Sequence, residues 1–176
     1  MTPSPMARLD YHAFTTEYAS FAMINSEMLI AAFDGRREYG HEGIPGLGGE
    51  VQAEAEKQWT WLEAALAAAT TAHVIPVMHH PPFLETPAEP DQYFNWPAAP
   101  RARLLALFER YGVTDILCGH THTTTVVSAG GFTVHTVAGT AKALDDNGCG
   151  YKVVARGGRA IKCPLPSAPD QRYIRP

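Results

Sequence analysis

Apolar residues in this chain fall into short runs separated by polar, glycine-rich or proline-bearing stretches. From Tyr18 to Phe33 two such runs flank Asn25 and Ser26, residues that often form turns because their side chains bond nearby backbone groups. This pattern predicts a β-hairpin over 18–33. The later runs VTDILC, TVVSA, FTVHTVA, YKVVA and RAIKCPL, within 113–165, predict further short strands, most of them in a meander.

Two segments carry apolar residues at helical spacing instead. The stripe of the first, within 51–71, consists of Val51, Ala55, Trp59, Leu62 and Leu66. The second is predicted to begin near Pro100, which suits a first helical turn, and to end at Gly112. Its apolar side consists of Leu104, Leu105, Phe108 and Tyr111.

The segment from His73 to Cys118 reads as strand, helix, strand, with a long proline-bearing loop before the helix. A right-handed crossover would place its two strands parallel in one sheet. The chain is therefore predicted to belong to the α/β (α+β) class with a mixed sheet. In such sheets, ligands bind beyond the carboxyl ends of the strands.

Composition narrows the functional classes. A chain of 176 residues fits one domain, and no apolar run is long enough for a membrane span. The formal net charge of −4 argues against nucleic acid as the main ligand. The first residues show no secretory leader, so we expect a cytoplasmic protein.

Two histidine clusters stand at the expected carboxyl ends of the two parallel strands. MHHPPF contains His79 and His80, and CGHTH contains His120 and His122. An H-x-H pair on extended backbone directs both rings to one side, and Gly119 would let the chain turn there. Since neutral imidazole binds zinc, iron and manganese well, we expect the clusters to converge on a metal.

Two other interpretations of these histidines stay open. They are also consistent with polar strand ends satisfied by carbonyls and water. Alternatively, Cys118 joins His79, His120 and His122 in a tetrahedral structural zinc site, although Cys118 ends an apolar strand and should face the core. The three cysteines, Cys118, Cys149 and Cys163, form no C-x-x-C pair and are expected to be free thiols.

CGHTH resembles the closing G-H-x-H motif of the calcineurin-like metallophosphoesterases, and VMHHPPF resembles their preceding H-x-P strand end. HHPPFLE followed by YFNW is most similar to the branch of calcineurin-like phosphoesterase domain-containing proteins, which are serine/threonine phosphatases. The similarity covers about Tyr18 to Ile161. It implies a partial metallophosphatase fold of mixed sheets flanked by helices, lacking its amino-terminal strands. Residues 1–176 would then be one domain, the carboxyl-terminal portion, with its core at about 18–163.

The resemblance also assigns roles to residues. It implies His79 and His120 as ligands of one divalent metal and His122 as a ligand of a second, with zinc, manganese or iron as the metals. His80 is expected in the second shell at most. Apart from the resemblance, Asn95 is expected in a substrate loop, because the aromatic and amide cluster YFNW is suited to line a cleft. The family's earlier motifs D-x-H, G-D-x-x-D and G-N-H-[DE] are not present in the sequence. The carboxylates Asp34, Glu85, Asp91, Asp145 and Asp146 are better explained as turn or loop residues than as replacement ligands.

Two functional hypotheses follow. In the first, the chain is a metal-dependent phosphoesterase that hydrolyses a phosphate ester or phosphoprotein with a metal-activated hydroxide. In the second, it is a catalytically incomplete metal-binding or interaction module that self-associates, for example as a homodimer, because the missing strands leave sheet edges and faces uncovered.

Overall fold

The computed structural model describes residues 10–34, 48–139, 143–144, 155–157 and 160–162. Several predictions concern residues outside these ranges. They are the first four residues of the predicted strand YKVVA, the thiols of Cys149 and Cys163, and the carboxylates Asp145 and Asp146. Within the described part, no helix is both long and apolar enough to cross a membrane.

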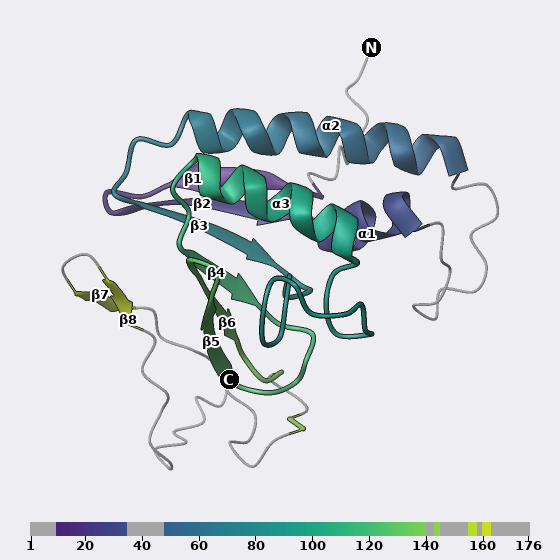
Figure 1. Cartoon of the computed structure of the whole chain (residues 1–176). Helices are drawn as coiled ribbons and strands as arrows, with labels where there is room; N and C mark the ends of the chain where they lie inside the picture. The colour runs from purple at the N-terminus through teal and green to yellow at the C-terminus, as the bar shows by residue number, and fades with distance from the viewer. Residues whose placement is uncertain (1–9, 35–47, 140–142, 145–154, 158–159, 163–176) are drawn as a thin grey trace, which may run out of the picture.

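The described strands form a mixed six-stranded sheet, which confirms the predicted α/β class (Figure 1). The strands are β1 His12–Thr15, β2 Ala19–Ile24, β3 His73–Met78, β4 Asp115–Cys118, β5 Thr125–Ala129 and β6 Phe132–Thr136. Their order is β1-β2-β3-β4-β6-β5, with β2, β3, β4 and β6 parallel and the two edge strands antiparallel. A separate pair consists of β7 Ala155–Gly157 and β8 Ala160–Lys162.

Three helices, α1 Ser26–Asp34, α2 Gly48–Ala67 and α3 Ala98–Arg110, gather along one side of this sheet (Figure 1). The connections β2 to β3 and β3 to β4 both step one strand in the same direction, so right-handed crossovers put their helices on the same face. The main core lies between them. Its most buried side chains include Leu29, Leu62, Leu104, Phe108 and Ile116.

The predicted hairpin over 18–33 is wrong. Its first half is β2, but Ser26–Asp34 is a helix, and β2 pairs with the unpredicted strand β1 instead. Asn25 caps this helix, because its Oδ1 accepts the backbone N–H of Met28 at 3.0 Å. Gln58 of α2 binds the backbone of Asn25 on both sides. Its side chain accepts the N–H of Asn25 at 2.8 Å and donates to the carbonyl of Asn25 at 3.0 Å.

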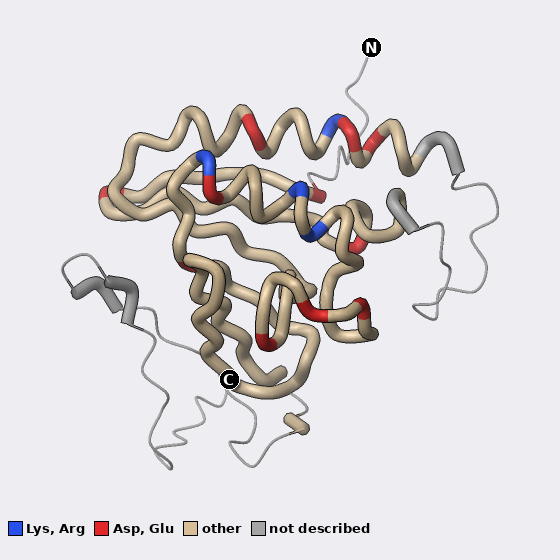
Figure 2. Tube along the Cα trace, viewed as in Figure 1, with Lys and Arg blue, Asp and Glu red and all other residues tan. Residues whose placement is uncertain are grey.

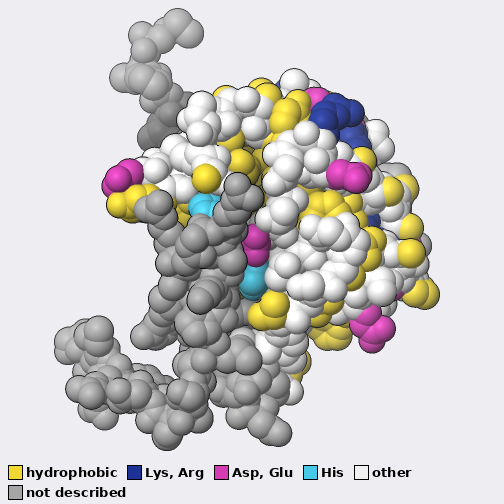
Figure 3. Space-filling model, turned by 60° about the vertical axis from the view of Figure 1, so that its left-hand side comes forward, with side chains coloured by type: hydrophobic (Ala, Val, Ile, Leu, Met, Phe, Trp, Pro, Cys, Tyr) yellow, Lys and Arg dark blue, Asp and Glu magenta, His cyan; other side chains and the backbone are white. Residues whose placement is uncertain are grey.

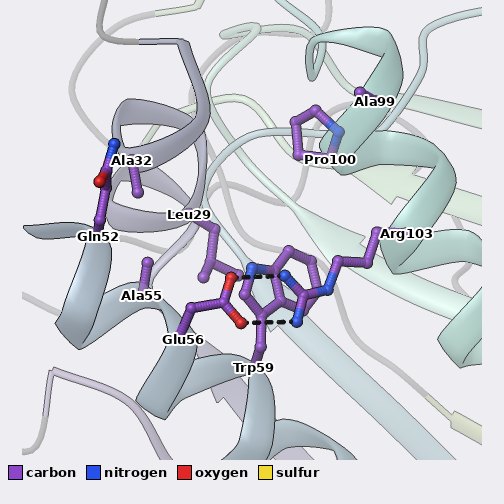
Figure 4. A pocket seen from close by; sticks show the side chains of 9 residues that line it. All are labelled: Leu29, Ala32, Gln52, Ala55, Glu56, Trp59, Ala99, Pro100 and Arg103. Carbon is purple, nitrogen blue, oxygen red and sulfur yellow. Dashed lines mark hydrogen bonds and ion pairs between the residues drawn. The ribbon is translucent and has the colours of Figure 1, made fainter.

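The two predicted helices are confirmed, and they lie side by side. Arg103 of α3 makes a two-pronged bond to Glu56 of α2, at 2.7 and 2.9 Å, and Arg110 bonds Glu63 at 2.7 Å. Beneath the first pair is a pocket of about 380 Å³ with Trp59 in its wall (Figure 4). Every lysine or arginine whose side chain the structure describes lies on α2 or α3 (Figure 2).

Side chains that alternate to the opposite face of the sheet are only partly buried in several places. Phe21, Val77 and Leu117 are half-buried there, while His135 is buried and lies 2.8 Å from Asp115. Histidine and acidic side chains reach the surface on the side shown in Figure 3. The sheet thus has a closely packed helical face and a second face of mixed apolar and polar character.

Candidate metal centre

The carboxyl ends of β3 and β4 bring three histidines together. His79 and His80 follow Met78, the last residue of β3, and His120 follows Cys118, the last residue of β4, after one glycine. One ligand atom of each ring lies within 4.8 Å of the other two. The backbone N–H of Gly119 donates to the carbonyl of His79 at 2.9 Å, which joins the two strand ends directly. The predicted convergence is therefore observed for three of the four histidines.

His79 and His120 form the tightest pair in this cluster. Nε2 of His79 lies 3.1 Å from Nδ1 of His120. The other nitrogen of His120, Nε2, lies 3.3 Å from the carbonyl oxygen of Tyr93. Because a carbonyl only accepts, Nε2 of His120 carries the proton, and Nδ1 presents its lone pair toward His79.

This pair fits a divalent metal. Two nitrogens bound tetrahedrally to zinc at 2.0–2.1 Å stand ~3.3 Å apart, close to the 3.1 Å between His79 and His120. Metal-binding histidines usually donate their other N–H to a carbonyl or carboxylate, as His120 does to Tyr93. The spacing of the two nitrogens and the outer bond of His120 both match a metal ligand pair.

His80 is held differently from its two neighbours. Its Nδ1 lies 2.9 Å from the Ser26 hydroxyl, and its backbone N–H donates to the same oxygen at 3.1 Å. Its carbonyl accepts the indole N–H of Trp96 at 3.0 Å, and its Nε2 lies 3.5 Å from a Glu27 carboxylate oxygen. His80 is 2% exposed, so it is the buried member of the cluster.

The surroundings of two of the three rings, those of His80 and His120, favour their neutral form. Burial, reinforced by the neighbouring His120 and His79, lowers the pKa of His80 to about 3. Burial also lowers the pKa of His120, and His79 and His122 add to this shift against the opposing bond to Tyr93. Because imidazole must be deprotonated to bind a metal, lowered pKa values keep the site competent below neutral pH.

The backbone of the second cluster is not extended, contrary to the sequence-based prediction. His120 has φ +67° and His122 has φ +54°, both in the left-handed region, whereas Gly119 has no positive φ. The turn is therefore made by the histidines themselves. A non-glycine residue held at positive φ is uncommon and is often found at functional sites.

His122 does not belong to the three-histidine group, although its charge contributes to the lowered pKa of His120. Its carbonyl accepts the backbone N–H of Leu144 at 2.8 Å. The role of His122 as a ligand of a second metal stays a prediction. The zinc site that included Cys118 is wrong, because this thiol faces the core and is 5% exposed.

The loop between β3 and α3 covers one side of the cluster. The aromatic rings of Tyr93 and Phe94 form the wall on this side. Their ring centroids lie 5.2 and 5.5 Å from the ring centroid of His120. Buried Asn95 holds this loop from inside, donating to Glu89 and to the carbonyl of Pro90 and accepting the backbone N–H of Gln92. Asn95 thus shapes the wall and does not face the metal ligands.

Glu89 is the anchor of this loop, and the sequence analysis missed it. Its carboxylate accepts three consecutive backbone N–H groups, those of Leu84, Glu85 and Thr86, at 2.7 to 3.0 Å. Although burial opposes its charge, the bonds from Asn95 and from these N–H groups lower its pKa overall. Arg101, 2% exposed, lies 3.8 Å away and donates to the carbonyl of Glu89.

The carboxylates considered from the sequence lie elsewhere. Glu85 is exposed in the loop, Asp91 caps α3 by accepting the backbone N–H of Ala98 at 2.8 Å, and Asp34 is the last residue of α1. The acid that does approach the cluster, Glu27, lies in the first turn of α1. In the sequence, Glu27 is marked only by its position directly after Asn25 and Ser26. Once these two residues are recognised as a helix start, Glu27 is expected in the first helical turn.

Comparisons with known proteins point to one group of enzymes. The chain is 31% identical over 112 residues to the serine/threonine-protein phosphatase CPPED1 of Danio rerio, covering 63% of this chain and 34% of that protein. It is 30% identical over 116 residues to CPPED1 of Rattus norvegicus, covering 64% and 32%. The chain therefore spans about a third of the length of these relatives. No family model matches the sequence.

Among solved structures, the chain is similar to GAP50, the anchor in the inner membrane complex of Plasmodium. The TM-score is 0.48 at 18% identity, and the alignment covers 72% of this chain and 35% of GAP50. This score is too low to bear on function. The sequence similarity to phosphatases and the histidine geometry are the two observations that do.

Proposed function

We propose that this chain carries part of the active site of a metal-dependent phosphoesterase, and that His79 and His120 bind one of its metals. The observation that supports this most directly is the 3.1 Å approach of Nε2 of His79 to Nδ1 of His120, with the outer N–H of His120 on the Tyr93 carbonyl. The similarity to CPPED1 phosphatases gives the reaction class.

A phosphate ester carries negative charge. The side chains gathered in the cluster are imidazoles, and no described lysine or arginine lies among them. The described lysine and arginine side chains lie on α2 and α3, where Arg103 and Arg110 are already paired with glutamates. A divalent metal held by His79 and His120 would supply the missing positive charge and would activate water for attack on phosphorus. The chain's own contribution is to hold two imidazole nitrogens at ligand spacing and to form one wall of the site with Tyr93 and Phe94.

The finer details are part of this proposal. The metals are zinc, manganese or iron, because imidazole suits all three. The substrate is a phosphate ester or a phosphoprotein, as the name of the CPPED1 relatives suggests. Tyr93 is 57% exposed beside His120, so an aromatic or peptide group next to the phosphate has a surface to contact.

Metal analysis and turnover together test the proposal. The purified chain is measured for bound zinc, manganese and iron, then assayed with a chromogenic phosphate monoester and diester in added metal. We expect bound metal and metal-dependent turnover, both lost in His79→Ala and kept in His73→Ala, a histidine at the opposite end of β3. Absence of both metal and turnover in the wild-type chain would refute the proposal. Bound metal without turnover, with a dimer by light scattering, would support the metal-binding module instead.

A further inference from the structure

Three histidines meet at the cluster, yet the hydrogen bonds divide them into two kinds. His79 and His120 face each other through ring nitrogens. His80 instead turns Nδ1 toward Ser26 and Nε2 toward Glu27, both at the first turn of α1. By proximity alone, all three rings are candidate ligands. Which nitrogen of the His80 ring carries the proton therefore bears on its role.

The Ser26 hydroxyl and the Glu27 carboxylate together favour one protonation of the ring. The Ser26 oxygen accepts the backbone N–H of His80 at 3.1 Å, so the hydroxyl hydrogen is available for Nδ1 of His80 at 2.9 Å. This arrangement uses both capacities of the hydroxyl. It leaves the ring proton on Nε2, which faces the Glu27 carboxylate oxygen at 3.5 Å. The reverse tautomer would point a lone pair at a carboxylate and leave the Ser26 hydrogen to find another acceptor.

The same contacts immobilise the backbone that carries His79. The peptide N–H of His80 is held by Ser26, its carbonyl by Trp96, and the preceding carbonyl, that of His79, by the N–H of Gly119. The neutral ring of His80 also packs against His120, with centroids 4.2 Å apart. Ser26 and His80 thus connect α1 to both rings of the ligand pair.

Resting on the proposed function, we propose that Ser26 and His80 are positioning residues of the metal centre and that His80 is not a metal ligand. Ser26 donates to Nδ1 of His80, and the locked His80 holds His79 and His120 at ligand spacing. Removing such support for metal ligands typically weakens metal binding by about 10–100-fold.

Variants at His80 separate positioning from ligation. Asparagine keeps an acceptor where Nδ1 meets Ser26 but has no atom at the position of Nε2, whereas leucine keeps neither. We expect His80→Asn to bind cobalt or zinc with nearly wild-type affinity and His80→Leu to bind about 10–100-fold more weakly. If His80→Asn loses as much affinity as His80→Leu, His80 is a ligand through Nε2 and the proposal is overturned.

Variants at the start of α1 test the other half. Ser26→Ala should weaken metal binding as His80→Leu does, and Ser26→Thr, which keeps a hydroxyl, should restore it. Asn25→Ala is the matched control, because it removes the helix cap one residue earlier without touching the cluster. It should lower the thermal midpoint and leave metal affinity unchanged. Unchanged affinity in Ser26→Ala, or equal losses in Asn25→Ala, would overturn the proposal.

Nitrogen NMR of the metal-free chain gives a readout that a purely structural role would not move. The His80 ring should show an unprotonated Nδ1 and a protonated Nε2 in the wild type, and a mixture in Ser26→Ala. A protonated Nδ1 in the wild type would contradict the proposal. These measurements need no turnover, so a chain that binds metal in this pattern but hydrolyses no ester would refute the proposed function alone.

Discussion

Nε2 of His79 and Nδ1 of His120 face each other at 3.1 Å although the two residues are 41 positions apart in the sequence. The parallel neighbours β3 and β4 produce this approach, since both chains leave the sheet at the same edge. The pair is held from three sides, by the Gly119 peptide, the Tyr93 carbonyl and the packed ring of His80.

Replacing members of the two histidine clusters should have unequal effects on metal binding. His120→Ala removes one nitrogen of the close pair, so metal affinity should fall by more than the ~10–100-fold typical of a supporting residue. His122→Ala should spare this site and, if the second metal implied by the family resemblance binds there, lower the stoichiometry by one equivalent. Calorimetric titration with elemental analysis measures both. Equal losses in the two variants would contradict the distinction drawn from the geometry.

The metal-free protein should lose stability in mild acid through His80. Its folded-state pKa is about 3, against 6.5 for an ordinary histidine, so the unfolded chain binds a proton first as the pH falls. Stability is therefore complete above about pH 6.5 and declines toward pH 3, by up to about 1.4 kcal/mol per pH unit. Glu27, His79 and His120 are the ionisable groups that face this ring.

Urea unfolding at pH 7, 6 and 5 measures this slope. His80→Asn removes the titrating ring and should flatten the curve between pH 6.5 and 5. A slope that persists unchanged in His80→Asn would assign the acid sensitivity to other groups.

The loop that walls the site should depend on Glu89. Glu89→Gln removes the charge beside buried Arg101 and weakens three backbone bonds. Removing one partner of a buried ion pair costs about 3 kcal/mol. Arg101 keeps its contact with Asp91 at 3.4 Å, so the unfolding free energy should fall by at most about that amount. Hydrogen exchange should also rise at Leu84, Glu85 and Thr86. Glu85→Gln, in the same loop but exposed, should change stability by less than about 0.5 kcal/mol.

The two ion pairs between α2 and α3 should differ in strength. Arg103 lies 4.4 Å from the centre of the Trp59 ring as well as bonding Glu56, whereas Arg110 bonds only glutamate among the contacts described. A cation–π contact made by a half-exposed cation such as Arg103 contributes about 0.5–1 kcal/mol. Arg103→Ala should therefore destabilise the chain by about that much more than Arg110→Ala in matched denaturation curves. Equal values would show that the ring contact is energetically silent.

Local patterns predicted α2 and α3, the parallel pair β3 and β4 and the core position of Cys118, because each follows from spacing within a short window. The start of α1 was missed because Asn25 and Ser26 favour a turn and a helix cap equally well. In the structure the backbone of Asn25 is held at the helix start by Gln58, 33 residues away, a contact that no local window contains. Glu89 was missed for a related reason: a lone glutamate in a proline-bearing loop gives no sign that three N–H groups will point at it.

The histidine motif predicted the chemistry of the site better than its backbone. Spacing indicated that His79 and His120 would meet, and they do. It did not reveal that His120 and His122 adopt positive φ, because that conformation depends on the turn that closes β4 toward β5. It also gave no means to separate His80 from its neighbours, since the separating contact comes from Ser26, 54 positions away.

Because His120 and His122 have a left-handed backbone, substitutions there that raise thermal stability should weaken metal binding in a laboratory evolution experiment. L-residues other than glycine, asparagine and aspartate bear a conformational penalty of about 1–2 kcal/mol in that region. Screening variants for heat resistance alone should therefore enrich glycine or asparagine at these two positions. Each enriched clone would melt higher while discarding an imidazole, so thermal selection would erode the histidine motif unless metal binding were selected alongside it.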